Sequence, residues 1–175
     1  MGDNLPDMSE AKALRIVMAG GGTGGHLFPG LAIAQEFMAR NKGNRVVFVS
    51  TGNPLERSVL SQTDFRLESV TAEGIKGRGL WNQAKSALKI PKGIMQALRI
   101  LKDYRPDLTV GLGSYSAGPV VVSAWLLRTK IVLHEQNILP GITNRILARL
   151  ADRIYVSFDD TKARFAPHKI RLTGN

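Results

Sequence analysis

The chain has 175 residues, of which 43% are hydrophobic and 22% charged, and it contains no cysteine. This length and balance predict a globular protein of about one domain, and the lack of cysteine excludes disulfides and thiolate metal sites. The formal net charge of +10, from 24 Lys and Arg against 14 Asp and Glu, predicts an anionic partner: nucleic acid, phospholipid or a phosphorylated substrate. No run approaches the roughly 18 apolar residues of a membrane span. The N-terminal residues carry acids and lack an apolar run, so we expect them not to be a signal peptide. We therefore expect a cytosolic protein, or one that lies on a membrane surface.

Short β-branched runs alternate with helical stretches along the chain. Strands are predicted at 15–19, 45–50, 65–70, 107–113, 130–135 and 153–157. Helices are predicted near 30–41, 54–63, 80–104, 115–128 and 141–151, and Pro91 is expected to break or kink the third. Continuous apolar strands between helices predict a doubly wound α/β fold, with a mostly parallel Rossmann-like sheet and helices on both faces.

The two ends of the chain differ from this pattern. We expect residues 1–14 to be a flexible lead and residues 15–175 to form the domain. The final "HKIRLTGN" predicts one more strand, which ends at Asn175 without a closing helix. We therefore expect the chain to be one domain of a longer protein.

Five glycines, a threonine and a histidine follow the first predicted strand in "GGGTGGH". Gly20, Gly22 and Gly25 have the G-x-G-x-x-G spacing of loops that hold a phosphate between backbone N–H groups and a helix N-terminus. A tight turn without a ligand is the alternative. A dinucleotide site also needs an acidic residue after the second strand, where this chain has Ser50 and Thr51. A nicotinamide-dependent enzyme therefore stays open as the weaker alternative.

His26 stands at the edge of this glycine loop. Chemistry on a sugar or a phosphate uses an imidazole as a general base, whereas a nicotinamide enzyme has no use for one at this place. A single histidine is as often structural, so the local sequence leaves both roles open.

Two further polar loops follow later strands. "GLGSYSAGP" comes after the fourth strand and "HEQN" after the fifth. Loops at the carboxyl ends of parallel strands meet at one edge of the sheet, where open α/β folds bind ligands. Tyr115 and Ser116 offer hydroxyl groups there, and "HEQN" offers a base, a carboxylate and two amides for a polyhydroxylated ligand. A capping serine, a half-buried ring and a polar surface loop are the structural alternatives. Glu135 is a candidate to orient His26 or His134.

Most of the excess positive charge lies in residues 74–105, which hold eight Lys and Arg against one acidic residue. Apolar residues keep helical spacing from Leu80 to Leu101, with lysines on a neighbouring stripe. A solvated face of a covering helix is one explanation. Basic residues beside Trp81 also favour binding to an anionic lipid surface. Aromatic residues total only 6%, and no strand shows stacking pairs, so we expect no nucleic-acid partner.

Taken together, "GGTGGHLFPGLAIA", "GLGSYSAGPVVVSAW" and "VLHEQN" resemble the N-terminal half of the MurG family of GT-B glycosyltransferases, in glycosyltransferase family 28. The resemblance runs from about Arg15 to the final "TGN". It implies a Rossmann-like acceptor-binding domain that works with a C-terminal UDP-sugar-binding domain outside this chain. The implied activity is transfer of N-acetylglucosamine from UDP-GlcNAc to undecaprenyl-pyrophosphoryl-N-acetylmuramoyl-pentapeptide (lipid I to lipid II) in peptidoglycan synthesis. The alternative for this half is binding of acceptor or membrane without activity.

The resemblance also implies site residues. UDP-GlcNAc contacts carry over to Thr23, Gly24, Gly25 and Asn137. His26 is implied as the catalytic base, with Glu135 in support. Candidate acceptor contacts are Gly22, Gly113, Ser114, Tyr115, Ser116, Gly118 and His134. The second loop departs from the family pattern at Ser114 and Ala117, whose Cβ atoms narrow the space for a pyrophosphate.

The implied mechanism is an inverting transfer with no metal and no other cofactor. The chain has no D-x-D stretch, and the N–H groups of the glycine loops would stabilise phosphate charge instead. The implied location is the cytoplasmic face of the bacterial inner membrane, as a peripheral protein. Candidate membrane contacts are Leu80, Trp81, Lys85, Lys89, Ile90, Lys92 and Trp125.

Overall fold

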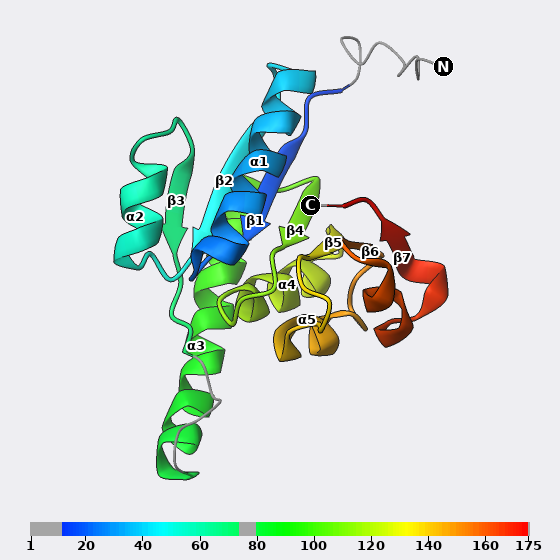
Figure 1. Cartoon of the computed structure of the whole chain (residues 1–175). Coiled ribbons are helices and arrows are strands. Elements are labelled where there is room, and N and C mark those ends of the chain that lie inside the picture. Colours follow the sequence, from blue (N-terminus) through cyan, green and yellow to red (C-terminus); the bar gives the residue numbers. More distant parts are fainter. Residues whose placement is uncertain (1–11, 74–79, 175) are drawn as a thin grey trace.

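The computed structural model describes residues 12–73 and 80–174, with the backbone alone at 80–88, 162 and 163. Strands and helices alternate along these ranges (Figure 1). The strands are β1 (Arg15–Ala19), β2 (Arg45–Ser50), β3 (Arg66–Ser69), β4 (Leu108–Gly111), β5 (Lys130–Glu135), β6 (Arg153–Val156) and β7 (Ile170–Leu172). The helices are α1 (Gly24–Arg40), α2 (Pro54–Leu60), α3 (Leu80–Tyr104), α4 (Ala117–Leu126) and α5 (Ile142–Leu147), with 3-10 segments η2 (Asp159–Arg164) and η3 (Pro167–Lys169).

The strands form one parallel sheet in the order β3-β2-β1-β4-β5-β6-β7. Val17 of β1, for example, lies beside Val47 of β2 on one side and Thr109 of β4 on the other. From β1 the chain builds outward through β2 and β3, and then continues from β4 on the opposite side. Open α/β sheets bind ligands outside the carboxyl ends of the strands where the order reverses. The topology confirms the predicted fold and places a candidate site beside the loops after β1 and β4.

Both faces of the sheet are covered, because successive side chains of a strand point to opposite faces. Ile16 and Met18 of β1 pack in one layer with Leu27 of α1. Val17 lies in the other layer with Ala97 of α3. All five side chains are fully buried. Strands buried on both faces explain the continuous apolar runs in the sequence.

Helix α1 begins at Gly24, six residues before the predicted start near residue 30. Glycine and proline are the poorest helix formers, and Pro29 lacks the N–H that would donate to Gly25, so the local sequence predicts a loop. Burial of Leu27 in the core outweighs this local preference. As a result, Gly24, Gly25 and His26 form the first turn of a helix.

Of the predicted break or kink at Pro91, the break is wrong, because helix α3 continues through this residue. Proline removes one backbone hydrogen bond from a helix interior. Packing compensates for that loss: Ala97 and Leu101 are buried, and the hydroxyl of Ser123 in α4 donates to the carbonyl oxygen of Ile94 at 3.1 Å.

The last part of the predicted lead belongs to the domain. The N–H of Leu14 donates to the side-chain oxygen of Asn44 at 2.8 Å, and its carbonyl oxygen accepts from the N–H of Arg45 at 2.8 Å. Residues 1–11, which make up most of that lead, lie outside the described part of the chain.

Gly93 allows α3 to approach its neighbours closely, so a larger residue at this position should destabilise the fold. A Cβ atom on Gly93 would overlap the carbonyl oxygen of Thr71 and lie 3.2 Å from Pro119, whereas one on Gly118 of α4 would meet nothing within 4 Å. We expect Gly93→Ala to lower the free energy of unfolding by about 1–3 kcal/mol, as overpacking does. Gly118→Ala is the control and should stay within about 0.5 kcal/mol of the parent. Urea unfolding measures both, and equal midpoints would contradict the prediction.

Candidate functional site

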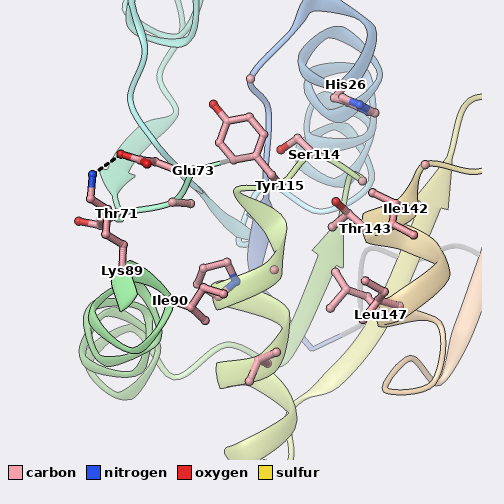
Figure 2. Close-up of a pocket in the computed structure, with 18 of the residues that line it drawn as sticks. His26, Thr71, Glu73, Lys89, Ile90, Ser114, Tyr115, Ile142, Thr143 and Leu147 are labelled. Carbon is pink, nitrogen blue, oxygen red and sulfur yellow. Dashed lines mark hydrogen bonds and ion pairs between the residues drawn. The ribbon is translucent and has the colours of Figure 1, made fainter. Parts of the chain in front are cut away.

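A cavity of about 850 Å³ lies between the loops after β1 and β4 and the helices α3, α4 and α5 (Figure 2). Of the predicted substrate and catalytic residues, those that line it are Gly22, Thr23, His26, Gly113, Ser114, Tyr115 and Gly118, and the predicted membrane contacts Lys89 and Ile90 line it too. In the view of Figure 2, Tyr115 and Ser114 lie between His26 and the ion pair of Glu73 with Lys89. The fold therefore brings two motifs that are about 90 residues apart into one site.

The remaining wall of the cavity is mainly apolar. Its apolar residues are Ile90 and Ile94 of α3, Pro119 and Val122 of α4, and Ile142, Ile146 and Leu147 of α5. The sequence predicted a helix near 141–151, where α5 lies, but not that its side chains line the site, because a helix of six residues shows too little periodicity to tell which face is buried. A largely apolar cavity with polar groups gathered at one end is typical of a ligand site.

A buried carboxylate that sequence analysis missed holds the glycine loop. The Glu56 side chain is fully buried in α2. Its Oε1 accepts from the N–H of Gly22 at 2.6 Å and from the hydroxyl of Ser50, and its Oε2 accepts from the N–H of Asn53 at 2.8 Å. The capping-box pattern "NPLE" at the start of α2 is the signal that could have found it.

A chain of buried hydroxyl groups extends this network to the second loop. Ser116 contacts Ser50 at 2.9 Å and Ser114 at 2.6 Å, and Ser114 accepts from the N–H of Gly21 at 3.2 Å. Ser116 is fully buried and does not line the cavity. The structure therefore corrects its predicted role as an acceptor contact: its hydroxyl links the end of β2 to Ser114 in the loop after β4.

The expectation that the glycine loop offers its N–H groups to a phosphate also needs correction. The N–H groups of Gly21 and Gly22 donate to Ser114 and Glu56, inside the protein. The N–H groups at the start of α1, from Gly24 and Gly25, have no acceptor within the helix because they belong to its first turn. Helix N-termini attract anions, so of the two predicted phosphate partners only the helix N-terminus keeps its N–H groups available.

Glu135 organises the loop after β5. Its carboxylate is buried and accepts from the N–H and the side-chain amide of Asn137, at 3.0 and 2.9 Å, and from Gly141 and the buried Asn144, at 3.1 and 3.0 Å. Neither His26 nor His134 is hydrogen-bonded to it within the described residues. The prediction that Glu135 orients one of these histidines is therefore wrong for direct contact, and its position instead fixes Asn137, which is exposed.

The residue that contacts both histidines is Gln136 and not, as predicted, Glu135. The side-chain oxygen of Gln136 lies 3.2 Å from His26 Nδ1, and its side-chain nitrogen lies 3.0 Å from His134 Nδ1. His134 is buried, and this burial lowers the pKa of its imidazole, with smaller opposing effects from a backbone hydrogen bond to Gly174 and the charge of Glu135. His134 does not line the cavity, so its predicted acceptor contact is not direct.

The candidate membrane contacts lie on α3 and α4. Ile90, Lys92 and Trp125 are exposed, and Lys89 is paired with Glu73. The side chains of Leu80, Trp81 and Lys85 are outside the described part of the structure. Across residues 12–73 and 80–174, no helix is both long enough and apolar enough to cross a bilayer.

Carboxylates and imidazoles do not gather at the cavity. In the described ranges no group of three or more His, Asp or Glu residues is placed to hold a metal ion. The polar groups that line the cavity are backbone groups, hydroxyls, the imidazole of His26 and the ion pair of Glu73 with Lys89.

The fold and the site together define a Rossmann-like α/β domain with a ligand cavity at the carboxyl edge of its parallel sheet. The glycosyltransferase family 28 N-terminal domain matches residues 16–156. The chain belongs to this family, which confirms the resemblance of its three motifs.

Individual relatives agree with this assignment. The chain is 47% identical over 162 residues to the UDP-N-acetylglucosamine–N-acetylmuramyl-(pentapeptide) pyrophosphoryl-undecaprenol N-acetylglucosamine transferase of Syntrophus aciditrophicus (strain SB), covering 93% of this chain and 45% of that protein. The protein of the same name from Geobacter sulfurreducens is 46% identical, with coverages of 93% and 44%. The crystal structure of Acinetobacter baumannii MurG matches with a TM-score of 0.77 and 29% identity, covering 92% of this chain and 45% of that one. The chain therefore spans a little under half the length of these relatives.

The hydrogen bonds of the buried Glu56 carboxylate should stabilise the folded chain. Both carboxylate oxygens accept hydrogen bonds, so Glu56→Gln places an NH₂ group against other donors whichever way the amide points. We expect the free energy of unfolding to fall by about 1–3 kcal/mol, the cost of buried unsatisfied groups. Glu36→Gln breaks an exposed pair with Arg40 and should cost less than about 0.5 kcal/mol. Equal urea midpoints for the two variants would show that the network contributes nothing.

Proposed function

We propose that this chain is the acceptor-binding half of an inverting glycosyltransferase that moves N-acetylglucosamine from UDP-GlcNAc to the 4-hydroxyl of a lipid-linked N-acetylmuramoyl-pentapeptide. The observation that carries the proposal is the position of His26, at the polar end of a cavity bordered by Thr23, Ser114 and Tyr115. The named activity of the relatives supports it. The product would be the lipid-linked disaccharide used in peptidoglycan synthesis.

The donor would contact the edge of this domain and bind mainly to a second domain. Thr23, Gly24, Gly25 and Asn137 are the proposed contacts. Thr23, Gly25 and Asn137 are exposed, and the free N–H groups at the start of α1 suit the diphosphate of the nucleotide. Glu135 would act through Asn137, whose side chain it holds.

The acceptor would occupy the cavity. Its pyrophosphate would lie near Gly22, Gly113 and Gly118, where little side-chain volume blocks the backbone, and Tyr115 would donate its hydroxyl. Ser114 lines the cavity, and its hydroxyl accepts from the N–H of Gly21, so its side chain would border the pyrophosphate. The apolar wall formed by α3, α4 and α5 suits the lipid end of such a molecule.

His26 would act as the general base. As the acceptor oxygen forms a bond to the anomeric carbon, the bond from that carbon to the diphosphate oxygen breaks, and its electron pair leaves with UDP. The proton of the acceptor hydroxyl passes to the imidazole of His26. No metal ion or other cofactor enters this mechanism, because helix N–H groups would stabilise the charge on the leaving diphosphate.

Replacing the proposed base tests the mechanism. In a full-length transferase that contains this chain, we expect His26→Ala to lower kcat by roughly 10²- to 10⁴-fold, the usual contribution of general base catalysis. His168→Ala is the matched control, because His168 is exposed on η3 and should leave kcat unchanged. Transfer of radiolabelled N-acetylglucosamine measures both. Near-normal turnover of His26→Ala would remove this residue from catalysis, and the 175-residue chain alone should transfer no sugar.

We further propose that α3 and α4 bind an anionic membrane surface, at the cytoplasmic face of the inner membrane. Lys92 on α3 is exposed, and so are the large apolar side chains of Ile90, Met95 and Trp125. Exposed apolar residues next to basic ones favour binding to anionic lipid, with roughly 1 kcal/mol for each Lys or Arg near the surface. The second domain of the same parent protein is the other proposed partner.

Vesicle sedimentation tests the membrane proposal. We expect stronger binding to vesicles that contain phosphatidylglycerol than to phosphatidylcholine alone. Lys92→Glu should weaken binding by at least about 5-fold, since each basic residue contributes about 1 kcal/mol. Lys42→Glu makes the same charge change at an exposed position beyond the end of α1 and should bind as the parent does. Equal binding to neutral and anionic vesicles would defeat the electrostatic part of the proposal.

A further inference from the structure

The side-chain amide of Gln136 lies between two imidazoles and one backbone carbonyl group. Its nitrogen Nε2 lies 3.3 Å from the carbonyl oxygen of Leu112 and 3.0 Å from His134 Nδ1, and its oxygen Oε1 lies 3.2 Å from His26 Nδ1. The residue is buried. Each atom of this amide therefore has a protein partner.

The carbonyl group of Leu112 fixes which way the amide points. A carbonyl oxygen only accepts hydrogen bonds, so the amide nitrogen must face it. The opposite orientation would place the Gln136 oxygen against the Leu112 oxygen, with no proton between them. The oxygen of the amide therefore faces His26.

This orientation determines where the proton of neutral His26 lies. An amide oxygen only accepts, so the nitrogen that faces it, Nδ1 of His26, must carry the proton. In a neutral imidazole the other nitrogen then has a free lone pair. Since His26 lines the cavity, the free lone pair on Nε2 is the one available to a ligand.

His134 holds the opposite tautomer. The Gln136 nitrogen donates to its Nδ1, so this nitrogen must accept and the proton of the neutral ring lies on Nε2. A charged His134 would place an N–H against the amide N–H. Burial favours the neutral ring, because it lowers the pKa of this imidazole. The two histidines therefore have complementary roles around one amide.

We propose that Gln136 is a positioning residue that locks His26 in the Nδ1–H tautomer and so keeps Nε2 ready to take a proton. The tautomer follows from the contacts of Gln136 alone, while its value for catalysis rests on the proposed function. A neutral imidazole with the proton on the wrong nitrogen cannot accept one at the substrate, as the loss of orienting groups in other enzymes shows. Gln136 thus takes the role that a carboxylate has in many acid–base sites.

Imidazole ¹⁵N NMR of the 175-residue chain tests the tautomers without any assay of activity. Spectra are recorded at a pH about two units above the ordinary pKa of imidazole, where free histidine is neutral. We expect a pyridine-type Nε2 and a pyrrole-type Nδ1 for His26, and the reverse for His134. A His26 ring with its proton on Nε2, or one that averages between both tautomers, would overturn the proposal.

Two substitutions of Gln136 make the test specific. In Gln136→Glu the carboxylate only accepts, so His134 should change to the Nδ1–H tautomer while His26 keeps its own. Gln136→Met removes the acceptor, so His26 should lose its single tautomer. Gln62→Met, at an exposed position, is the control and should leave both spectra unchanged. An unchanged His26 spectrum in Gln136→Met would refute the lock, and if that variant does not fold, the parent and Gln136→Glu spectra still decide.

Kinetics of the full-length transferase test the catalytic consequence. We expect Gln136→Met to lower kcat by roughly 10-fold or more with little change in KM for UDP-GlcNAc, because the imidazole spends less time in the productive tautomer. Gln136→Glu should restore most of kcat, since it accepts from Nδ1. Equal loss in both variants would mean that Gln136 acts only through packing. If the proposed transferase activity itself failed, the NMR spectra would still report on the tautomer.

Discussion

The hydrogen bonds of the buried Glu56 carboxylate hold the carboxyl edge of the sheet, where the cavity lies, and the rest of the site depends on them. The carboxylate accepts hydrogen bonds from the glycine loop after β1 and from the end of β2. The hydroxyls of Ser50, Ser116 and Ser114 carry the same network to the loop after β4. A buried carboxylate is costly unless its oxygens are satisfied, so each donor is held in place. The start of α1, and with it His26, is positioned as a consequence.

A second buried carboxylate repeats this arrangement after β5. Glu135 accepts hydrogen bonds from Asn137 and from Gly141. Gln136, which lies between Glu135 and Asn137 in the sequence, contacts His26. The exposed groups of the site are thus held in place by buried groups that have their own hydrogen-bond partners. This separation explains why several residues of the polar motifs do not line the cavity: they orient the residues that do.

Much of the fold and part of the site could be predicted from the sequence. Apolar runs located the strands of the sheet, and the three motifs located its loops. Local signals failed where tertiary packing outweighed them: α1 forms through Gly25 and Pro29 because Leu27 is buried, and α3 passes Pro91 because it packs against α4. The role of Ser116 was wrong for a related reason, since spacing along a chain does not show which side of a loop faces the core.

The sequence by itself therefore determined the α/β class, the order of the elements and the family, because these depend on patterns that lie close together along the chain. Only the tertiary structure decided which groups meet: Glu56 with Gly22, Gln136 with two histidines, and α5 with the far wall of the cavity. Glu56 lies 34 residues from Gly22 along the chain, and Gln136 lies 110 residues from His26. Strand order and register bring such distant residues together, and both are set by burial of the whole sheet.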